Sequence, residues 1–214
     1  MSSASAARPL EVRHLQLARA VAAAIAAAMV TFSPDHSSAF GLSVFSGFAI
    51  LTAIMMFAAA WLVYPRGRRG AAVLIGVLDV VAGMIAGIGP LRSDTTFFVL
   101  VAVWALATGV AEGVVGLRAR RAGLPDARDA IFIGALGVVL AIALLCVPAG
   151  YALNYTIDEA HQTFTLTGIT IGVGIFGAYT AIAAVYLGIA GFSPRKDATP
   201  ELAAASDEHP GGAA

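Results

Sequence analysis

Long apolar runs alternate with short polar segments along the whole chain, and six of the runs are long enough to cross a bilayer. A bilayer core is crossed by about 20 helical residues. Because open strands would leave backbone groups unpaired in lipid, we expect every run to be a helix. The last run is long enough to tilt or to begin outside the bilayer. The runs are residues 15–32, 40–63, 71–89, 96–117, 130–151 and 164–192.

The runs also repeat one another in pairs. Residues 75–81 (IGVLDVV) precede Pro90, and residues 133–139 (IGALGVV) precede Pro148 at the same spacing. Pro34 closes the first, Ala-rich run in the same way. Repeats set the architecture before single residues are considered. The pattern therefore predicts an all-α membrane protein with six transmembrane helices arranged as three repeated helical hairpins.

The second run of each pair shares a pattern of its own, an aromatic residue followed four positions later by threonine. A threonine hydroxyl in a membrane helix bonds the carbonyl one turn back or reaches a neighbouring helix. The three pairs are Phe48 and Thr52, Trp104 and Thr108, and Phe176 and Thr180.

These patterns predict one transmembrane domain over residues 13–194, with hairpins at about 13–66, 70–121 and 128–194. Residues 1–12 and 195–214 are polar and rich in small residues and proline, so we expect disordered cytoplasmic tails. A cleaved signal peptide ending near residue 39 is the alternative for the first run. The alignment of Pro34 with the other hairpin prolines favours a retained helix.

The basic residues predict the orientation. Every Lys and Arg except Arg92 precedes or begins the first run, joins runs two and three or four and five, or follows run six. The positive-inside rule then places both termini in the cytoplasm of a multi-pass plasma-membrane protein, a bacterial inner-membrane protein. The residues on this side are Arg8, Arg13, Arg19, Arg66, Arg68, Arg69, Arg118, Arg120, Arg121, Arg128, Arg195 and Lys196.

Composition excludes several classes of protein. Charged residues make up 12% of the chain, against about 25% in a soluble domain, so a water-exposed exterior is not available. The net charge is zero, which argues against a nucleic-acid partner and leaves the lipid bilayer as the expected one. The single cysteine, Cys146, lies in an apolar run and is expected to be a packing residue.

Three ionisable residues fall inside the predicted spans, where a charge costs about 2.5–3.5 kcal/mol even on a mild insertion scale. The repeat places Arg19 and Glu112 at nearly the same depth. Asp79 lies about four residues deeper, level with Thr108. Arg19, Asp79, Thr108 and Glu112 therefore form a candidate intramembrane polar patch.

This patch has two interpretations. It carries protons or holds a small ion, or its members are structural. In the structural case Arg19 and Glu112 reach the nearby headgroups and Asp79 makes one buried hydrogen bond. A structural role explains Asp79 less readily than it explains Arg19 and Glu112, because the counterparts of Asp79 in the repeat, Ala23 and Gly137, carry no charge.

Enzyme chemistry has no visible basis in the sequence. No histidine lies in a span, and neither a phosphate-binding GxxxxGK[ST] loop nor an HExxH helix is present. We therefore expect no enzyme activity, no catalytic residues, no cofactor and no metal site. Asp158, Glu159 and His161 are expected to belong to a solvated outer loop.

Glycine recurs at four-residue spacing, which permits close approach of helices in lipid. The spacing has two explanations, generic packing or a face for a homo-oligomer or a membrane protein partner. The pairs are Gly83 and Gly87, Gly109 and Gly113, and Gly168 and Gly172.

Residues 73–81 followed by Pro90, residues 104–109 in an Arg-ended helix, and the three-hairpin plan resemble the HdeD family of bacterial membrane proteins. The likeness covers most of residues 15–192. Gly137 at the position of Asp79 and the long third outer loop depart from it. The resemblance implies a six-span inner-membrane protein, linked in enteric bacteria to acid resistance, with no catalytic residues to carry over.

The expected function is therefore that of a non-enzymatic HdeD-like membrane protein in acid or envelope stress. One alternative is a small transporter or channel that uses Arg19, Asp79 and Glu112, which predicts a water-accessible cavity reaching Asp79. Another is a helical scaffold for a partner protein, which predicts a packed interior and an exposed glycine-lined groove.

Overall fold

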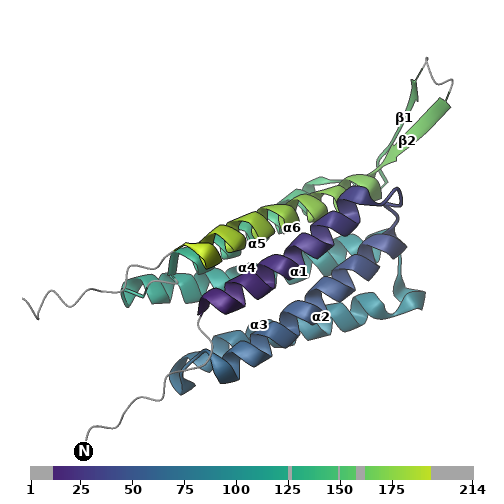
Figure 1. Ribbon diagram of the computed structural model, residues 1–214. Helices are drawn as coiled ribbons and strands as arrows, with labels where there is room; N and C mark the ends of the chain where they lie inside the picture. Colours follow the sequence, from purple (N-terminus) through teal and green to yellow (C-terminus); the bar gives the residue numbers. More distant parts are fainter. Residues whose placement is uncertain (1–11, 125–126, 149, 158–161, 194–214) are drawn as a thin grey trace, which may run out of the picture.

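The structure, a computed structural model, describes residues 12–124, 127–148, 150–157 and 162–193. In these ranges the chain forms six long helices and one small sheet (Figure 1). All six helices are long and apolar enough to cross a membrane, which confirms the predicted all-α membrane fold class. They are α1 (Val12–Phe32), α2 (Ser38–Leu62), α3 (Arg69–Gly87), α4 (Asp94–Arg121), α5 (Ala127–Cys146) and α6 (Gly168–Phe192).

Hydroxyl residues cap the start of three helices. The Oγ of Ser37 accepts a hydrogen bond from the Phe40 amide at the start of α2. Ser93 and Thr167 accept equivalent bonds at the starts of α4 and α6. Each cap satisfies one of the amides that a helix leaves unpaired at its N-terminus. Two short 3-10 turns, η1 (Arg66–Arg68) and η2 (Gly89–Leu91), lead into α3 and follow it.

The six helices close into a ring. Each helix contacts the next in the chain, and α1 also lies beside α6 (Figure 1). The closest packing joins α2 to α3, α4 to α5 and α6 to α1, which means that it runs between the predicted hairpins rather than inside them. A Cβ atom on Gly109 of α4 would lie 2.8 Å from the carbonyl oxygen of Gly134 in α5, so only glycine permits this approach.

The predicted glycine pairs are used inside the chain. A Cβ atom on Gly83 would lie 2.8 Å from the side chain of Ile50, and one on Gly172 would lie 2.9 Å from that of Phe98. Together with Gly109, these positions serve generic packing between neighbouring helices. A shallow groove between α4 and α5 is lined by Gly109 and Gly113, among others. That a second copy or another membrane protein binds these glycine-containing helix faces stays a prediction.

Helices α2, α4 and α6 meet at the centre of the bundle. The ring of Trp104 lies 6.0 Å from that of Phe48, and Phe48 lies 6.0 Å from Phe176, all in edge-on contacts. These are the three aromatic residues that the predicted repeat aligns. Such pairs contribute about 0.5–1.5 kcal/mol beyond their burial. The three-hairpin repeat itself stays a prediction from the sequence.

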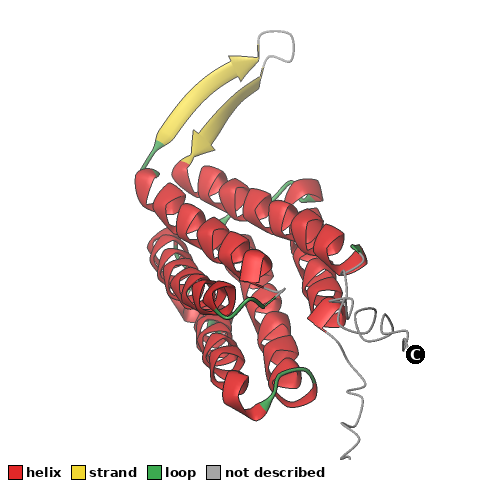
Figure 2. Ribbon diagram, turned by 90° about the vertical axis from the view of Figure 1, so that its left-hand side faces the viewer, coloured by secondary structure: helices red, strands yellow, loops and turns green. Residues whose placement is uncertain are grey.

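The segment after α5 differs from expectation. A hairpin of β1 (Ala152–Ile157) and β2 (Gln162–Thr167) extends away from the bundle, with Ala152 opposite Thr167 (Figure 2). The helix expected from residue 164 was therefore wrong in its first turn, since α6 begins at Gly168. Threonine at every second position from 163 to 167 favours a strand over a helix.

Helix α5 is also displaced from its predicted range. It begins at Ala127 and ends at Cys146, rather than extending to residue 151, because Pro148 disfavours a helical conformation at Val147. Cys146 was expected to be packed, and its side chain is exposed at the end of the helix. The predicted tails fall outside the described residues, apart from Val12 in α1, and so do Asp158, Glu159 and His161.

Candidate intramembrane polar site

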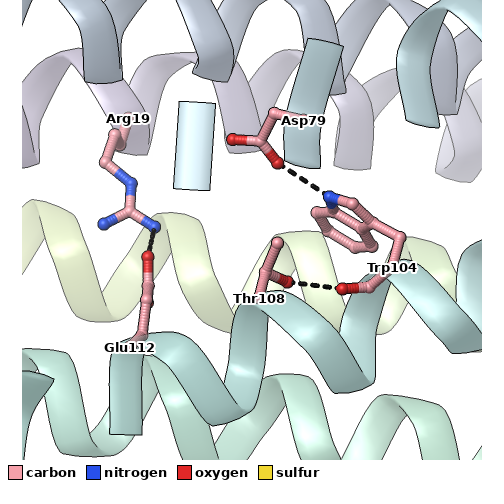
Figure 3. A network of polar contacts seen from close by, with 5 residues as sticks. All are labelled: Arg19, Asp79, Trp104, Thr108 and Glu112. Carbon is pink, nitrogen blue, oxygen red and sulfur yellow. Dashed lines mark hydrogen bonds and ion pairs between the residues drawn. The ribbon is translucent and has the colours of Figure 1, made fainter. Parts of the chain in front are cut away.

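Arg19 of α1 and Glu112 of α4 form an ion pair across the bundle (Figure 3). The Nη2 atom of Arg19 lies 2.5 Å from Oε1 of Glu112, and the two side chains are 17% and 7% exposed. The repeat predicted nearly the same depth for both residues, and the contact is consistent with this, because two side chains on different helices meet only at a similar height along the bundle. The pair offsets the cost of placing each charge in an apolar bundle.

Asp79 of α3 is bound by Trp104 of α4. The indole nitrogen of Trp104 donates a hydrogen bond of 2.7 Å to Oδ1 of Asp79, which is 1% exposed. The second oxygen, Oδ2, has no hydrogen-bond partner among the described residues, and Figure 3 shows it on the side of Arg19. The structural interpretation, in which Asp79 makes one buried hydrogen bond, therefore accounts for only one of its two carboxylate oxygens.

Trp104 was not predicted as a site residue. The repeat placed Asp79 level with Thr108, and Trp104 lies one helical turn away from that residue. An indole nitrogen only donates hydrogen bonds. A tryptophan within one helical turn of the depth of an intramembrane carboxylate is therefore the signal that would have identified Trp104.

Thr108 does not contact Asp79. Its Oγ1 donates a 2.7 Å hydrogen bond to the backbone oxygen of Trp104 in the same helix. This is the local bond that threonine commonly makes in membrane helices. Thr108 therefore joins the polar patch only through Trp104.

A cavity of about 960 Å³ leads to the ion pair. It lies between α1, α3, α4 and α5, at the end of the bundle where α2 is joined to α3. We call this end, which carries Arg66, Arg68 and Arg69, the Arg-rich end. Both Arg19 and Glu112 line it, and Oε2 of Glu112 has no hydrogen-bond partner among the described residues. Asp79 does not line the cavity, so the cavity stops short of the residue that the transporter alternative expects it to reach.

A second polar network lies beside the ion pair. Gln16 of α1 donates to Oδ2 of Asp129 in α5, and the Tyr186 hydroxyl of α6 donates to Oδ1 at 3.2 Å. Gln16 and Asp129 also line the cavity. The network ties three helices together next to Arg19, which lies three residues after Gln16 on the same face of α1.

Neither Gln16 nor Asp129 was predicted as a site residue, because Asp129 stands at the edge of an apolar run and resembles a loop residue. In the structure α5 begins two residues before it, so its side chain projects from the first turn of the helix. The spacing of Gln16 and Arg19 on one helical face is the signal that would have identified the network.

The site offers carboxylate oxygens and a guanidinium at the inner end of a cavity. The described residues contain no group of three His, Cys, Asp or Glu side chains that could hold a metal ion. Two buried carboxylate oxygens without partners can accept a proton, a water molecule or another hydrogen-bond donor. The arrangement therefore suits proton or hydrogen-bond chemistry.

A family model described as a short repeat of unknown function (DUF308) matches part of the chain. Residues 74–146 match it. The match extends from Leu74 in α3 to Cys146 at the end of α5 and contains Asp79, Trp104 and Glu112. The chain matches none of the curated proteins and none of the solved structures.

Proposed function

We propose that this chain is an HdeD-like, multi-pass protein of the bacterial inner membrane that contributes to acid or envelope stress resistance without catalysing a reaction. The observation that carries the proposal is the short-repeat match over residues 74–146 in a chain with six helices suited to cross a membrane. The arginines that gather at one end of the bundle support cytoplasmic termini.

Loss of the protein tests this function. A strain that lacks the chain should survive acid or envelope stress less well than its parent, and expression of the full chain should restore survival. A strain that survives both stresses as well as its parent would remove the proposal.

The cavity supports a second candidate, a small transporter or channel for protons or a small ion. It reaches Arg19 and Glu112 from the Arg-rich end. Asp79 lies outside the cavity, and one of its buried oxygens has no hydrogen-bond partner among the described residues. Buried ionisable groups of this kind commonly mark ion and proton pathways in membrane proteins.

Reconstitution tests the second candidate. Vesicles that hold the protein and a trapped pH dye should dissipate an imposed pH gradient faster than protein-free vesicles. Asp79→Asn and Glu112→Gln should each slow this flux, whereas Asp94→Asn, at an exposed residue that does not line the cavity, should leave it unchanged. A wild-type protein with no flux above the protein-free vesicles would exclude proton transport.

A further inference from the structure

We propose that the cavity at the Arg-rich end binds the headgroup of an anionic membrane phospholipid, whose acyl chains leave the cavity between α3 and α4. The proposal rests on neither the stress function nor ion transport, although it concerns the same cavity as the transport candidate. The proposal is supported by the charge of the cavity, by its opening and by its size.

The charge of the cavity suits a phosphate group. Its charged lining, among the described residues, consists of three arginines against two carboxylates. Glu112 is paired with Arg19, and both oxygens of Asp129 accept hydrogen bonds. Arg68 and Arg118, from η1 and α4, line the same space. Guanidinium groups recognise phosphate oxygens, and basic pockets between membrane helices bind anionic headgroups.

We infer that the cavity opens toward lipid between α3 and α4. Leu74, Val110 and Val114 line it, and they are 51%, 50% and 40% exposed. Leu74 belongs to α3 and the two valines to α4. Small residues, including Ala71, Ala107 and Ala111, line the space between the two helices. An acyl chain can leave through this gap without losing contact with apolar side chains.

The opening and the size favour a phospholipid over a soluble anion. A soluble phosphate would gain nothing from an apolar wall that faces the hydrocarbon of the bilayer. The volume of about 960 Å³ lies near the upper end of ligand sites, which are roughly 300–1,000 Å³. That space accommodates a headgroup with the first part of its chains, with Arg68 in the lining.

Native mass spectrometry of the detergent-purified full chain tests the proposal with two lipids of identical chains. Phosphatidylglycerol should be retained in clear excess over phosphatidylcholine. The double variant Arg68→Gln with Arg118→Gln should weaken phosphatidylglycerol binding by roughly tenfold or more, because each basic residue contributes on the order of 1 kcal/mol.

The matched control is Arg120→Gln with Arg121→Gln. It removes the same charge from the Arg-rich end, and neither residue lines the cavity. This variant should keep the preference for phosphatidylglycerol. Equal retention of the two lipids by the wild type, or an equal loss in the control, would overturn the proposal, since binding would then reflect general surface charge.

A variant that fills the cavity provides a test independent of charge. Ala111→Phe should reduce lipid retention, whereas Val99→Phe, on an exposed part of α4 outside the cavity, should not. Competition identifies the source of the phosphate. If inorganic phosphate displaces phosphatidylglycerol at similar concentration, or if Ala111→Phe retains full lipid binding, the phospholipid site is excluded.

Discussion

The indole nitrogen of Trp104 donates a 2.7 Å hydrogen bond to Asp79 and so joins α4 to α3 in the interior of the bundle. Both side chains are buried, at 5% and 1% exposed. A buried carboxylate that loses its only hydrogen-bond partner carries its full desolvation cost. The relationship therefore links the central aromatic cluster to the most buried acid of the described chain.

The first prediction concerns this bond. Trp104→Phe should lower the free energy of unfolding by roughly 1–3 kcal/mol, because Asp79 is left without a donor. In an Asp79→Leu background the same change should cost less, since no carboxylate remains to be satisfied. A double-mutant cycle from denaturant unfolding in detergent measures this coupling. A coupling energy of zero would show that the bond does not stabilise the fold.

The ion pair gives the second prediction. Glu112→Ala should destabilise the protein by about 3–5 kcal/mol, because Arg19 is left buried without its counter-charge. Replacing both residues, as Arg19→Met with Glu112→Leu, should restore much of that loss, since an apolar pair has no charge to desolvate. Thermal unfolding of the wild type and the two variants provides the comparison. A double variant less stable than Glu112→Ala would contradict the argument.

The third prediction uses the close contact of α4 and α5. Gly109→Ala should destabilise the bundle by about 1–3 kcal/mol, because its Cβ would meet the backbone of Gly134 at 2.8 Å. Gly113→Ala is the matched control, since a Cβ there meets nothing within 4 Å. It should have little effect or stabilise the helix slightly. Equal destabilisation by both changes would show that the contact between α4 and α5 at Gly109 does not determine the loss of stability.

Topology gives the fourth prediction. Cys146 is the only cysteine and is exposed at the end of α5 that leads to the β-hairpin. With cytoplasmic termini, a membrane-impermeant maleimide should label it on intact inner-membrane spheroplasts. A Cys146→Ser chain that carries Ser193→Cys, after α6, should be labelled only after lysis. Labelling of the second variant in intact spheroplasts would reverse the orientation.

The sequence predicted the six helices well, because apolar length is a local property, and it placed Arg19 level with Glu112, to which Arg19 is paired. Apolar length identifies a spanning helix, and a constant rise per residue converts a position into a depth. Arg19 and Glu112 could therefore be paired by counting along the repeat. The β-hairpin was missed because an apolar segment next to a long helix reads as part of that helix. Alternating threonines were the local signal against it.

The neighbours of each helix and the direction of each side chain were decided by the tertiary structure. Each residue turns about 100° around a helix, so depth leaves the facing side open until the helices pack. Packing brought Trp104 rather than Thr108 to Asp79 and placed Asp129 beside Gln16. It also left the arginine-lined cavity between α1, α3, α4 and α5. The amino-acid order alone sets how deep each charge lies, whereas side-chain packing sets what each charge meets.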